Sequence, residues 1–371
     1  MALIQEFLRK GGLIEDLTKT KKYSLKVKRH NEFKSLVLFK YSQKKSSFAE
    51  PMVCEARGLI LDEQDNWKIV AYPYNKFFNA NEKFSKPILE IFKENGFTVY
   101  EKVDGSLMTL YFYGNKWNVA TSGTPDASGI CHKNAQLTFA NLFWQVWNEL
   151  GYKLPSTEDQ NKCFMFELLT PHNQVIVPQS SNRLVFHGVR NLDTLQEEKP
   201  EQYSKYNWEL ISVYDHETLD DALVTAYEAD PKFTEGYVIT SKDFHRVKAK
   251  GKEYVALTYG GNNNKTPSFL DIVMRGEQSE YIATFPDSEN KINSLTRQYR
   301  NLSDGIMGKY NQWKDLSMSE IKNNIATEKI QYGRCIELLK LGKISSPDEW
   351  LKKLSKTKLK KFMRKCKFDK A

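Results

Sequence analysis

Cysteines and long apolar runs are scarce in this chain. Its five cysteines lie far apart and lack metal-ligand spacing, which favours a reduced, intracellular protein over a disulfide-bonded secreted one. No apolar run approaches the ~20 residues needed to span a bilayer, and the N-terminal segment is too interrupted for a signal peptide. The sequence therefore predicts a cytoplasmic protein with no membrane partner.

Two common kinds of catalytic signature are also missing. The pattern G-x-x-x-x-G-K-[ST] does not occur, which excludes a P-loop kinase or helicase. Four of the six histidines are isolated, without matching carboxylate or cysteine spacing, so we expect core or surface roles for them. This applies to His132, His172, His187 and His245.

The charge that is present is positive and unevenly distributed. The 371 residues carry a formal net charge of +9, and residues 347–371 contain ten Lys and Arg against three Asp and Glu. This stretch therefore carries most of the surplus. Charge alone leaves two interpretations open, a surface that binds a polyanion and an ordinary solvated helix face.

Strand-like and helix-like patterns occupy different parts of the chain. From about residue 35 to 255, short apolar runs separated by turn signals predict strands, with helical patterns at 134–151 and 218–230. After about Leu257 the spacing is helical, and Ser346, Pro347 and Glu349 give the last segment a helix-start signal. We predict an α+β domain over residues 1–258 and an all-helical domain over 259–371, with the boundary at 259–267.

One lysine stands beside a tight-turn signal. Lys102 begins the run K-V-D-G-S between two strand-like segments. Alone this is a weak signal, because a lysine beside an Asp-Gly turn is most often solvated. A lysine pair near residue 250 favours a functional site over an ordinary solvated lysine, since strand alternation puts Lys248 and Lys250 on one face. Two ammonium groups on one face repel each other unless an anion lies between them.

Three further charged residues stand in or beside apolar strands. Glu167 lies inside the run C-F-M-F-E-L-L, where a carboxylate is costly unless it is paired or hydrogen-bonded. Glu235 opens the strand E-G-Y-V-I, and Arg57 precedes the strand of E-A-R-G-L-I. Together with the lysines, these residues are candidates for a charged functional site.

The order K-x-D-G-S, F-x-F-E, E-G-Y-V-I, V-K-x-K resembles that of the covalent nucleotidyltransferases, which include ATP-dependent DNA and RNA ligases and capping enzymes. The flanking runs E-A-R-G-L-I, Y-P-Y-N-K-F-F-N-A-N-E and R-L-V-F-H-G-V-R-N are similar to the bacteriophage-type RNA ligase 1 family. The resemblance covers residues 35–255 well and the helical remainder loosely. It implies an antiparallel-sheet nucleotidyltransferase (adenylyltransferase) domain, followed by an all-α domain with no OB-fold.

The resemblance implies catalytic roles for the charged motif residues. Lys102 is the nucleophile that attacks the α-phosphorus of ATP to form lysyl-AMP, and nearby cations and a metal ion would favour loss of its proton. Lys248 and Lys250 neutralise charge on the phosphates. Glu167 accepts a hydrogen bond from the ribose. Glu235 helps to hold Mg²⁺, for which Mn²⁺ can substitute.

The same resemblance implies a wider nucleotide site. Arg57 and Lys76 are expected to bind phosphate, and Gly105 to let the backbone approach the nucleotide closely. The other residues expected at this site are Tyr41, Phe78, Asp104, Ser106, Gly236 and Tyr254.

Two positions depart from the family pattern. Ser122 stands where phage relatives carry a lysine in the strand after the K-x-D-G hairpin. Relatives also carry an acidic pair early in the helical domain. Here Glu280, with Glu277 nearby, is the matching candidate metal ligand.

These residues lead us to expect an ATP-dependent RNA ligase that joins 5′-phosphate and 3′-hydroxyl ends through lysyl-AMP and RNA-adenylate intermediates. The helical domain and its basic tail would hold RNA through phosphate contacts. Phage relatives act on broken tRNA, which suggests a role in RNA repair or tRNA processing. We expect a monomer, in a virus-infected host cell if the phage resemblance extends to its source.

Two alternatives stay open. A DNA ligase or capping-type transferase shares the lysine chemistry but should carry a β-barrel after the last lysine motif. A non-catalytic RNA-binding protein with a ligase-like fold would keep the basic tail and lose charged motif members. All five of those members are present, namely Lys102, Glu167, Glu235, Lys248 and Lys250.

Overall fold

A computed structural model describes residues 1–131, 134–260 and 268–365 of the chain. The chain divides into two compact units, Met1–Asn264 and Lys265–Ala371. The division falls within the boundary stretch expected at 259–267, of which residues 261–267 lie outside the described part. Within the described ranges, no helix is both long enough and apolar enough to cross a membrane.

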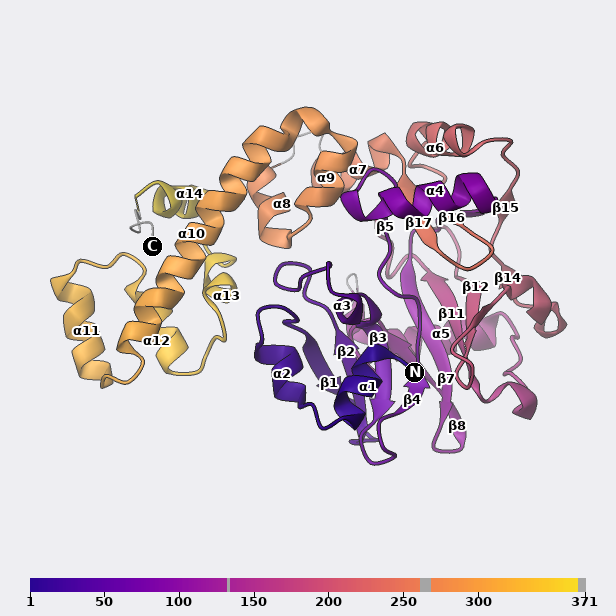
Figure 1. Ribbon diagram of the computed structural model, residues 1–371, viewed down its shortest axis with the longest axis horizontal. Helices are drawn as coiled ribbons and strands as arrows, with labels where there is room; N and C mark the ends of the chain where they lie inside the picture. The colour runs from indigo at the N-terminus through magenta and orange to yellow at the C-terminus, as the bar shows by residue number, and fades with distance from the viewer. Residues whose placement is uncertain (132–133, 261–267, 366–371) are drawn as a thin grey trace. The chain divides into compact units, whose positions relative to one another are not determined.

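Among its described residues, the first unit contains three larger sheets (Figure 1). The first sheet has the order β1 (Lys26–Arg29), β2 (Leu36–Lys40), β3 (Arg57–Asp62), β4 (Lys68–Ala71). The central sheet has the order β13 (Glu197–Glu198), β12 (Arg183–Asn191), β11 (Lys162–Leu169), β7 (Ser106–Tyr113), β8 (Lys116–Thr121), with β14 (Glu209–Leu210) beside β12. The third sheet has the order β15 (Val213–Tyr214), β6 (Thr98–Glu101), β16 (Gly236–Thr240), β17 (Arg246–Lys250), β5 (Phe78–Asn79).

The strand pairs in these sheets are antiparallel, apart from β14 beside β12 and β5 beside β17. Helices of the same unit pack around the sheets. They are α1 (Leu3–Arg9), α2 (Ile14–Lys19), α3 (Pro51–Glu55), α4 (Lys86–Asn95), α5 (Phe139–Glu149), α6 (Leu219–Glu228) and α7 (Lys252–Gly260). This arrangement confirms the predicted α+β class with an antiparallel-sheet domain.

Alternation along the strands gives the third sheet two different faces. Ile239 and Val247 are buried in a cluster with residues of α4 and α6. Their strand neighbours Val238 and Arg246 must point to the opposite face, because successive side chains of a strand alternate. That opposite face is the one that lines the pocket described below.

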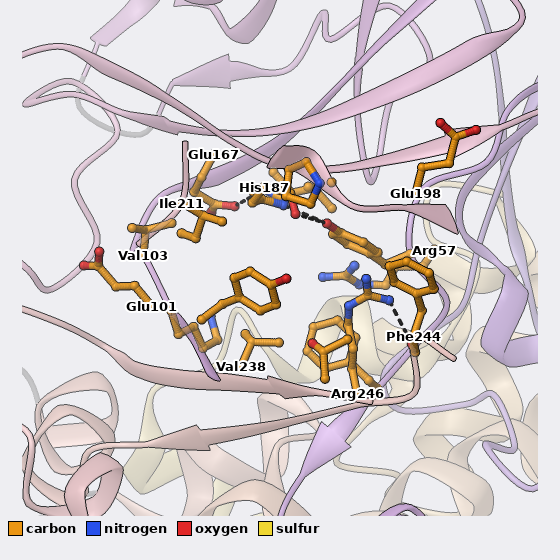
Figure 2. Close-up of a pocket in the computed structure, with 18 residues that line it drawn as sticks. Arg57, Glu101, Val103, Glu167, His187, Glu198, Ile211, Val238, Phe244 and Arg246 are labelled. Carbon is orange, nitrogen blue, oxygen red and sulfur yellow. Dashed lines mark hydrogen bonds and ion pairs between the residues drawn. The ribbon is translucent and has the colours of Figure 1, made fainter. Parts of the chain in front are cut away.

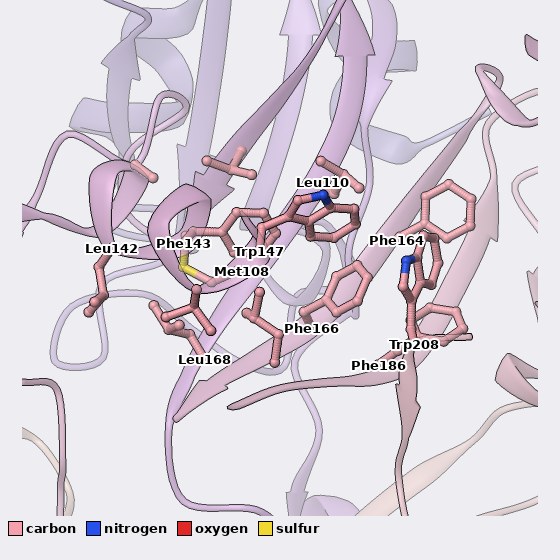
Figure 3. Close-up of a cluster of buried hydrophobic side chains, with 14 of the residues drawn as sticks. Met108, Leu110, Leu142, Phe143, Trp147, Phe164, Phe166, Leu168, Phe186 and Trp208 are labelled. Carbon is pink, nitrogen blue, oxygen red and sulfur yellow. The ribbon is translucent and has the colours of Figure 1, made fainter. Parts of the chain in front are cut away.

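An aromatic core covers one face of the central sheet (Figure 3). Trp147 of α5 lies 5.6 Å from Phe166 of β11, measured between ring centroids. Phe166 also lies 5.2 Å from Phe186 and 5.1 Å from Trp208. These side chains are buried, and burying such large rings supplies much of the free energy that holds α5 on the sheet.

The structure corrects one predicted helix and confirms another. The pattern at 134–151 predicted a single helix, but Asn134–Thr138 forms strand β10, which pairs with β9 (Ile130–Cys131). The helix α5 begins only at Phe139, because the Thr138 hydroxyl accepts a hydrogen bond from the Asn141 N–H and caps it. The helix expected at 218–230 is α6, capped in the same way by Thr218.

The second unit is helical over residues 268–365, which confirms that part of the fold prediction. Its longest helix, α10 (Glu289–Trp313), buries Ile292, Tyr299, Leu302 and Ile306 along one stripe. The surrounding helices are α8 (Phe269–Arg275), α9 (Gln278–Thr284), α11 (Met318–Thr327), α12 (Gly333–Lys340), α13 (Pro347–Leu351) and α14 (Lys356–Lys365).

The last basic segment begins as the sequence predicts and then breaks. Pro347 is the first residue of α13, with Ser346 in the N-cap position. The Ser346 side chain makes no capping hydrogen bond, and the Glu349 carboxylate instead accepts one from the Ser345 N–H at 3.0 Å. The segment forms two short helices, and residues 366–371 of the tail lie outside the described part.

Replacing Phe166 by Ala should lower the free energy of unfolding by about 3–5 kcal/mol, because the truncation leaves a cavity among the rings of Trp147, Phe186 and Trp208. Urea unfolding followed by tryptophan fluorescence measures this difference. Val224→Ala is the control, since Val224 is 54% exposed on α6 and should change the free energy by less than about 0.5 kcal/mol. Equal losses in the two variants would show that the aromatic cluster is not a stability centre.

Candidate active site

A pocket lies between the central sheet and the third sheet. Figure 2 shows Glu167, His187 and Ile211 on one wall and Val238 and Arg246 on the other. The full lining is Arg57, Tyr74, Phe77, Tyr100, Glu101, Lys102, Val103, Leu107, Glu167, His187, Gly188, Glu198, Pro200, Ile211, Val238, Thr240, Phe244 and Arg246.

Lys102 reaches this pocket from the end of β6 and is fixed at both its backbone and its amine. Its backbone N–H donates to the carbonyl oxygen of Gly236 at 2.8 Å. Its Nζ lies 2.6 Å from Oε2 of Glu235, and Lys250 Nζ lies 3.0 Å from Oε1 of the same carboxylate. One carboxylate therefore joins two of the lysines that the motifs had singled out.

Glu235 is a charged group held in the interior. It is 4% exposed, and burial by itself raises its pKa. The positive charges of Lys102 and Lys250 outweigh burial, so its net pKa lies below the ordinary value. We expected cations around the Lys102 amine. The group in contact with that amine is instead a carboxylate, and the amine lies in an ion pair.

Asp104 braces the loop that follows Lys102. Its Oδ2 accepts hydrogen bonds from the backbone N–H groups of Ile176 and Val177, each at 2.7 Å. Its Oδ1 accepts from the hydroxyl of Tyr254 on α7 at 2.6 Å. Burial, followed by the negative charge of Glu235, raises the pKa of Asp104. Both Asp104 and Tyr254 are buried, and their expected contact with a nucleotide stays a prediction.

Two glycines of the motifs sit where backbones meet. A Cβ on Gly105 would lie 2.5 Å from the carbonyl oxygen of Leu168 on β11. A Cβ on Gly236, whose φ is +135°, would lie 2.1 Å from the carbonyl oxygen of Ala249. The close approach seen at Gly105 is thus to a neighbouring strand, and its approach to a nucleotide stays a prediction. Ser106 accepts a hydrogen bond from the Asn173 side chain at 3.0 Å.

His187 lies in the pocket, although its sequence context had indicated a core or surface role. Its Nε2 lies 3.5 Å from Oε2 of Glu167. The Tyr74 hydroxyl donates to the His187 carbonyl at 2.8 Å and lies 2.9 Å from Nδ1. Because this hydroxyl has only one proton, Nδ1–H must donate to it, which leaves Nε2 facing Glu167. Within the described residues, Nε2 is buried without a hydrogen-bond partner.

Local sequence signals could have indicated the role of His187 only in part. It lies in the run R-L-V-F-H-G-V-R-N that carries the family resemblance. Its partner Tyr74 is 113 residues away along the chain, so no spacing rule links them. Gly188 supports the pair, because a Cβ there would lie 1.8 Å from the Tyr74 hydroxyl oxygen. His132, the first of the four histidines, lies outside the described residues.

The two residues expected to bind phosphate, Arg57 and Lys76, lie in different surroundings. Arg57 lines the pocket, stacks 5.3 Å from the ring centre of Phe77, and has a buried Nη1 without a hydrogen-bond partner. Lys76 is not among the lining residues. Its Nζ lies 5.1–5.5 Å from the ring centres of Tyr41, Phe48 and Phe78, which is cation–π distance.

Strand β17 keeps the predicted shared face of Lys248 and Lys250. These lysines and Arg246 are partly exposed, while Val247 and Ala249 between them are buried. Lys248 lies opposite Val238 in the strand register, beside the pocket wall. Arg246, which the motifs did not single out, is held by Glu197 at 2.6 Å.

The expected metal ligands are not tested by the structure. Glu280 lies on α9 in the second unit, and its role stays a prediction. Across the described ranges, no group of three or more His, Cys, Asp and Glu could hold a metal ion.

Replacing Glu235 by Gln should destabilise the protein in a pH-dependent way. The change leaves Lys102 and Lys250 without their anion, and we expect a loss of roughly 3 kcal/mol at neutral pH. Because the folded-state pKa of Glu235 lies below the ordinary value of 4.5, its contribution is present above pH 4.5 and is lost as the pH falls further. Urea unfolding at several pH values measures the gap, which should narrow below pH 4.5.

The matched control for this experiment is Glu253→Gln. Glu253 is exposed on α7, so its replacement should leave the free energy of unfolding nearly unchanged at every pH. A gap for Glu235→Gln that stayed constant with pH would mean that the ion pair is not the source of the stability.

Comparison with known proteins adds the family. The model of the RNA ligase family matches residues 55–254. An RNA ligase of Rhodothermus phage RM378 is 24% identical over 337 residues, covering 73% of this chain and 74% of that protein. A protein of Autographa californica nuclear polyhedrosis virus, named for a polynucleotide kinase and an RNA ligase, is 27% identical over 79% of this chain but only 43% of its own length.

Solved structures of a Naegleria gruberi RNA ligase are more distant. The form with ATP and Mn is 17% identical with a TM-score of 0.35, over 47% of this chain and 54% of that one. At this TM-score the likeness adds nothing to the assignment, which rests on the family match. That match extends over more than half of the 371 residues and includes Arg57, Lys102 and Glu235. The chain therefore belongs to the bacteriophage-type RNA ligase 1 family.

Proposed function

We propose that this protein is an ATP-dependent RNA ligase. The observation that carries the proposal is the Lys102 amine, which lies in ion-pair contact with buried Glu235 and lines a pocket shared with Glu167 and Arg57. A lysine that can be a nucleophile, a carboxylate beside it and a guanidinium in the same pocket are the groups that nucleotidyl transfer needs. Family membership supports the same reading.

In the first step, the neutral amine of Lys102 attacks the α-phosphorus of ATP. The bond from phosphorus to the pyrophosphate oxygen breaks, and pyrophosphate leaves with the electron pair. Lys102 must first lose a proton, and Oε2 of Glu235, 2.6 Å away, is the acceptor in contact with it. Lys250 on the other carboxylate oxygen would balance the charge on the phosphate as the new bond forms.

A divalent ion, Mg²⁺ or its substitute Mn²⁺, would be held by Glu235 and the phosphates, and would supply further charge neutralisation there. Glu167 faces the pocket from β11, where it can accept a hydrogen bond from a ribose hydroxyl. Nε2 of His187 lies 3.5 Å from this carboxylate, on the same wall of the pocket.

In the next two steps AMP passes to an RNA 5′-phosphate, and a 3′-hydroxyl then displaces AMP to form the phosphodiester bond. The second unit supports an RNA substrate through its charge: α14 buries Leu359, Phe362 and Met363 and exposes lysines on its other face. This pattern fits phosphate contacts, and broken tRNA is the substrate we propose.

Two further features are proposals of the same kind. We infer a reducing, intracellular setting, which the free thiols of Cys54, Cys131, Cys163 and Cys335 support. We also infer that the protein acts as a monomer, since the proposed chemistry uses residues of one chain.

The proposal predicts covalent labelling at Lys102. Purified protein, freed of AMP with pyrophosphate, is incubated with α-³²P-labelled ATP and Mg²⁺ and separated on a denaturing gel. We expect a labelled band that Lys102→Ala abolishes and that labelled GTP does not give. Lys116→Ala is the control, because Lys116 is exposed on the β8 edge and pairs with Glu32, so labelling should be unchanged.

The labelled protein then distinguishes the alternatives. Transfer of AMP to single-stranded RNA with a 5′-phosphate supports the RNA ligase, whereas preference for nicked DNA or for a GTP-derived label supports a DNA ligase or a capping-type transferase. No label in the wild type would contradict the proposal and leave an RNA-binding relative of the fold.

A further inference from the structure

Two cations, Lys40 and Arg57, lie on adjacent strands of the first sheet. In the register of β2 and β3, Lys40 lies directly opposite Arg57. Like charges in such a pair destabilise a sheet. The register shifts by one residue just before Lys40, at the point where Gly58 has a φ of +100°. This bulge places the two cations opposite each other.

The same bulge brings the pair against the end of β8. A Cβ on Gly58 would lie 3.2 Å from the Cα of Ser122. The Ser122 hydroxyl accepts a hydrogen bond from Lys40 Nζ at 3.2 Å. A lysine from β2 therefore brings its ammonium to Ser122, the position where phage relatives carry a lysine of their own. No motif of the sequence includes Lys40.

The cluster formed by Lys40, Arg57 and Ser122 contains two cations and no acidic side chain. Burial lowers the pKa of Lys40, and the charges that add to this effect are all cations, Lys26, Arg57 and Lys28. Across the described ranges, no ion pair joins Lys40 or Arg57 to a carboxylate, and Nη1 of Arg57 is buried without a partner. Holding two partly buried cations together lowers the stability of the fold, unless an anion binds between them.

We propose that Lys40, Arg57 and Ser122 form a binding site for the pyrophosphate part of ATP. The proposal rests on the function proposed above and names a residue that the motifs do not include. Arg57 lines the same pocket as Lys102, so a nucleotide whose α-phosphate meets Lys102 can extend its outer phosphates toward this cluster. When the bond to pyrophosphate breaks, the electron pair stays on the pyrophosphate oxygen, and Lys40 and Arg57 stabilise that charge.

Lys26 provides a matched control for Lys40. It is the Cα partner of Lys40 on the other side, in β1, and it is exposed. Lys26→Met thus removes one positive charge next to the site without removing a group from it. Lys40→Met removes the partly buried ammonium itself, and Ser122→Ala removes its hydroxyl partner.

The first measurement is binding of inorganic pyrophosphate to AMP-free protein by calorimetry, with thermal unfolding of each variant alongside. We expect Lys40→Met to weaken pyrophosphate binding at least tenfold and Ser122→Ala to weaken it less, with Lys26→Met within about twofold of wild type. Lys40→Met should unfold at the same temperature as wild type or higher, since it removes a like-charge contact. Unchanged pyrophosphate binding together with a lower unfolding temperature would show that Lys40 is a structural residue, and would overturn the proposal.

The second measurement separates two sources of phosphate. Lys40→Met should raise the KM for ATP at least tenfold in lysyl-AMP formation, and should leave the joining of pre-adenylylated RNA unchanged, because the leaving group of that step is AMP and no outer pyrophosphate of ATP is present. A loss confined to the joining of pre-adenylylated RNA would place an RNA phosphate at the cluster instead and overturn the assignment. If wild-type protein binds pyrophosphate in a Lys40-dependent manner but is never labelled by ATP, the proposed function fails and the anion site stands.

Discussion

The arrangement of the pocket depends on one buried carboxylate. Glu235 joins Lys102, from the end of β6, to Lys250, from the end of β17. Each charge in this triad would be unfavourable there without the others. Because β6 and β17 lie on either side of β16 in one sheet, the ion pairs also fix where the amine of Lys102 can lie. The local electrostatics and the sheet register therefore support each other.

Charge is unevenly distributed around the pocket. The end near Lys102 holds a carboxylate balanced by two ammonium groups, whereas Arg57 and Lys40 on the first sheet have no acidic partner in the described ranges. A ligand with several negative charges gains more at this second place, since it displaces no carboxylate there. Glu167 and His187 form a third part of the lining, where the carboxylate and an imidazole nitrogen lie 3.5 Å apart.

The sequence supports the prediction of features that depend on short-range patterns. Alternation correctly placed Lys248 and Lys250 on one face, and the helical spacing of the last third was confirmed. The helix prediction was wrong at 134–138, because the apolar pattern there suited a strand as well as a helix. The Thr138 cap marks where the strand ends and the helix begins. Contacts between distant segments could not be predicted at all. The bridge from Lys102 to Glu235 spans 133 residues, and Lys40 becomes notable only through a bulge near Gly58.

The glycines of the pocket have a consequence for how substitutions in this protein should be interpreted. At Gly105, Gly188 and Gly236, an added methyl group would collide with Leu168, Tyr74 and Ala249, respectively. At these positions neighbouring segments approach so closely that there is no room for a side chain. In a saturation scan they would be as intolerant as Lys102, yet their intolerance would report assembly of the walls rather than chemistry. A map of intolerant positions would thus outline the shape of this pocket before it identified a single reacting group.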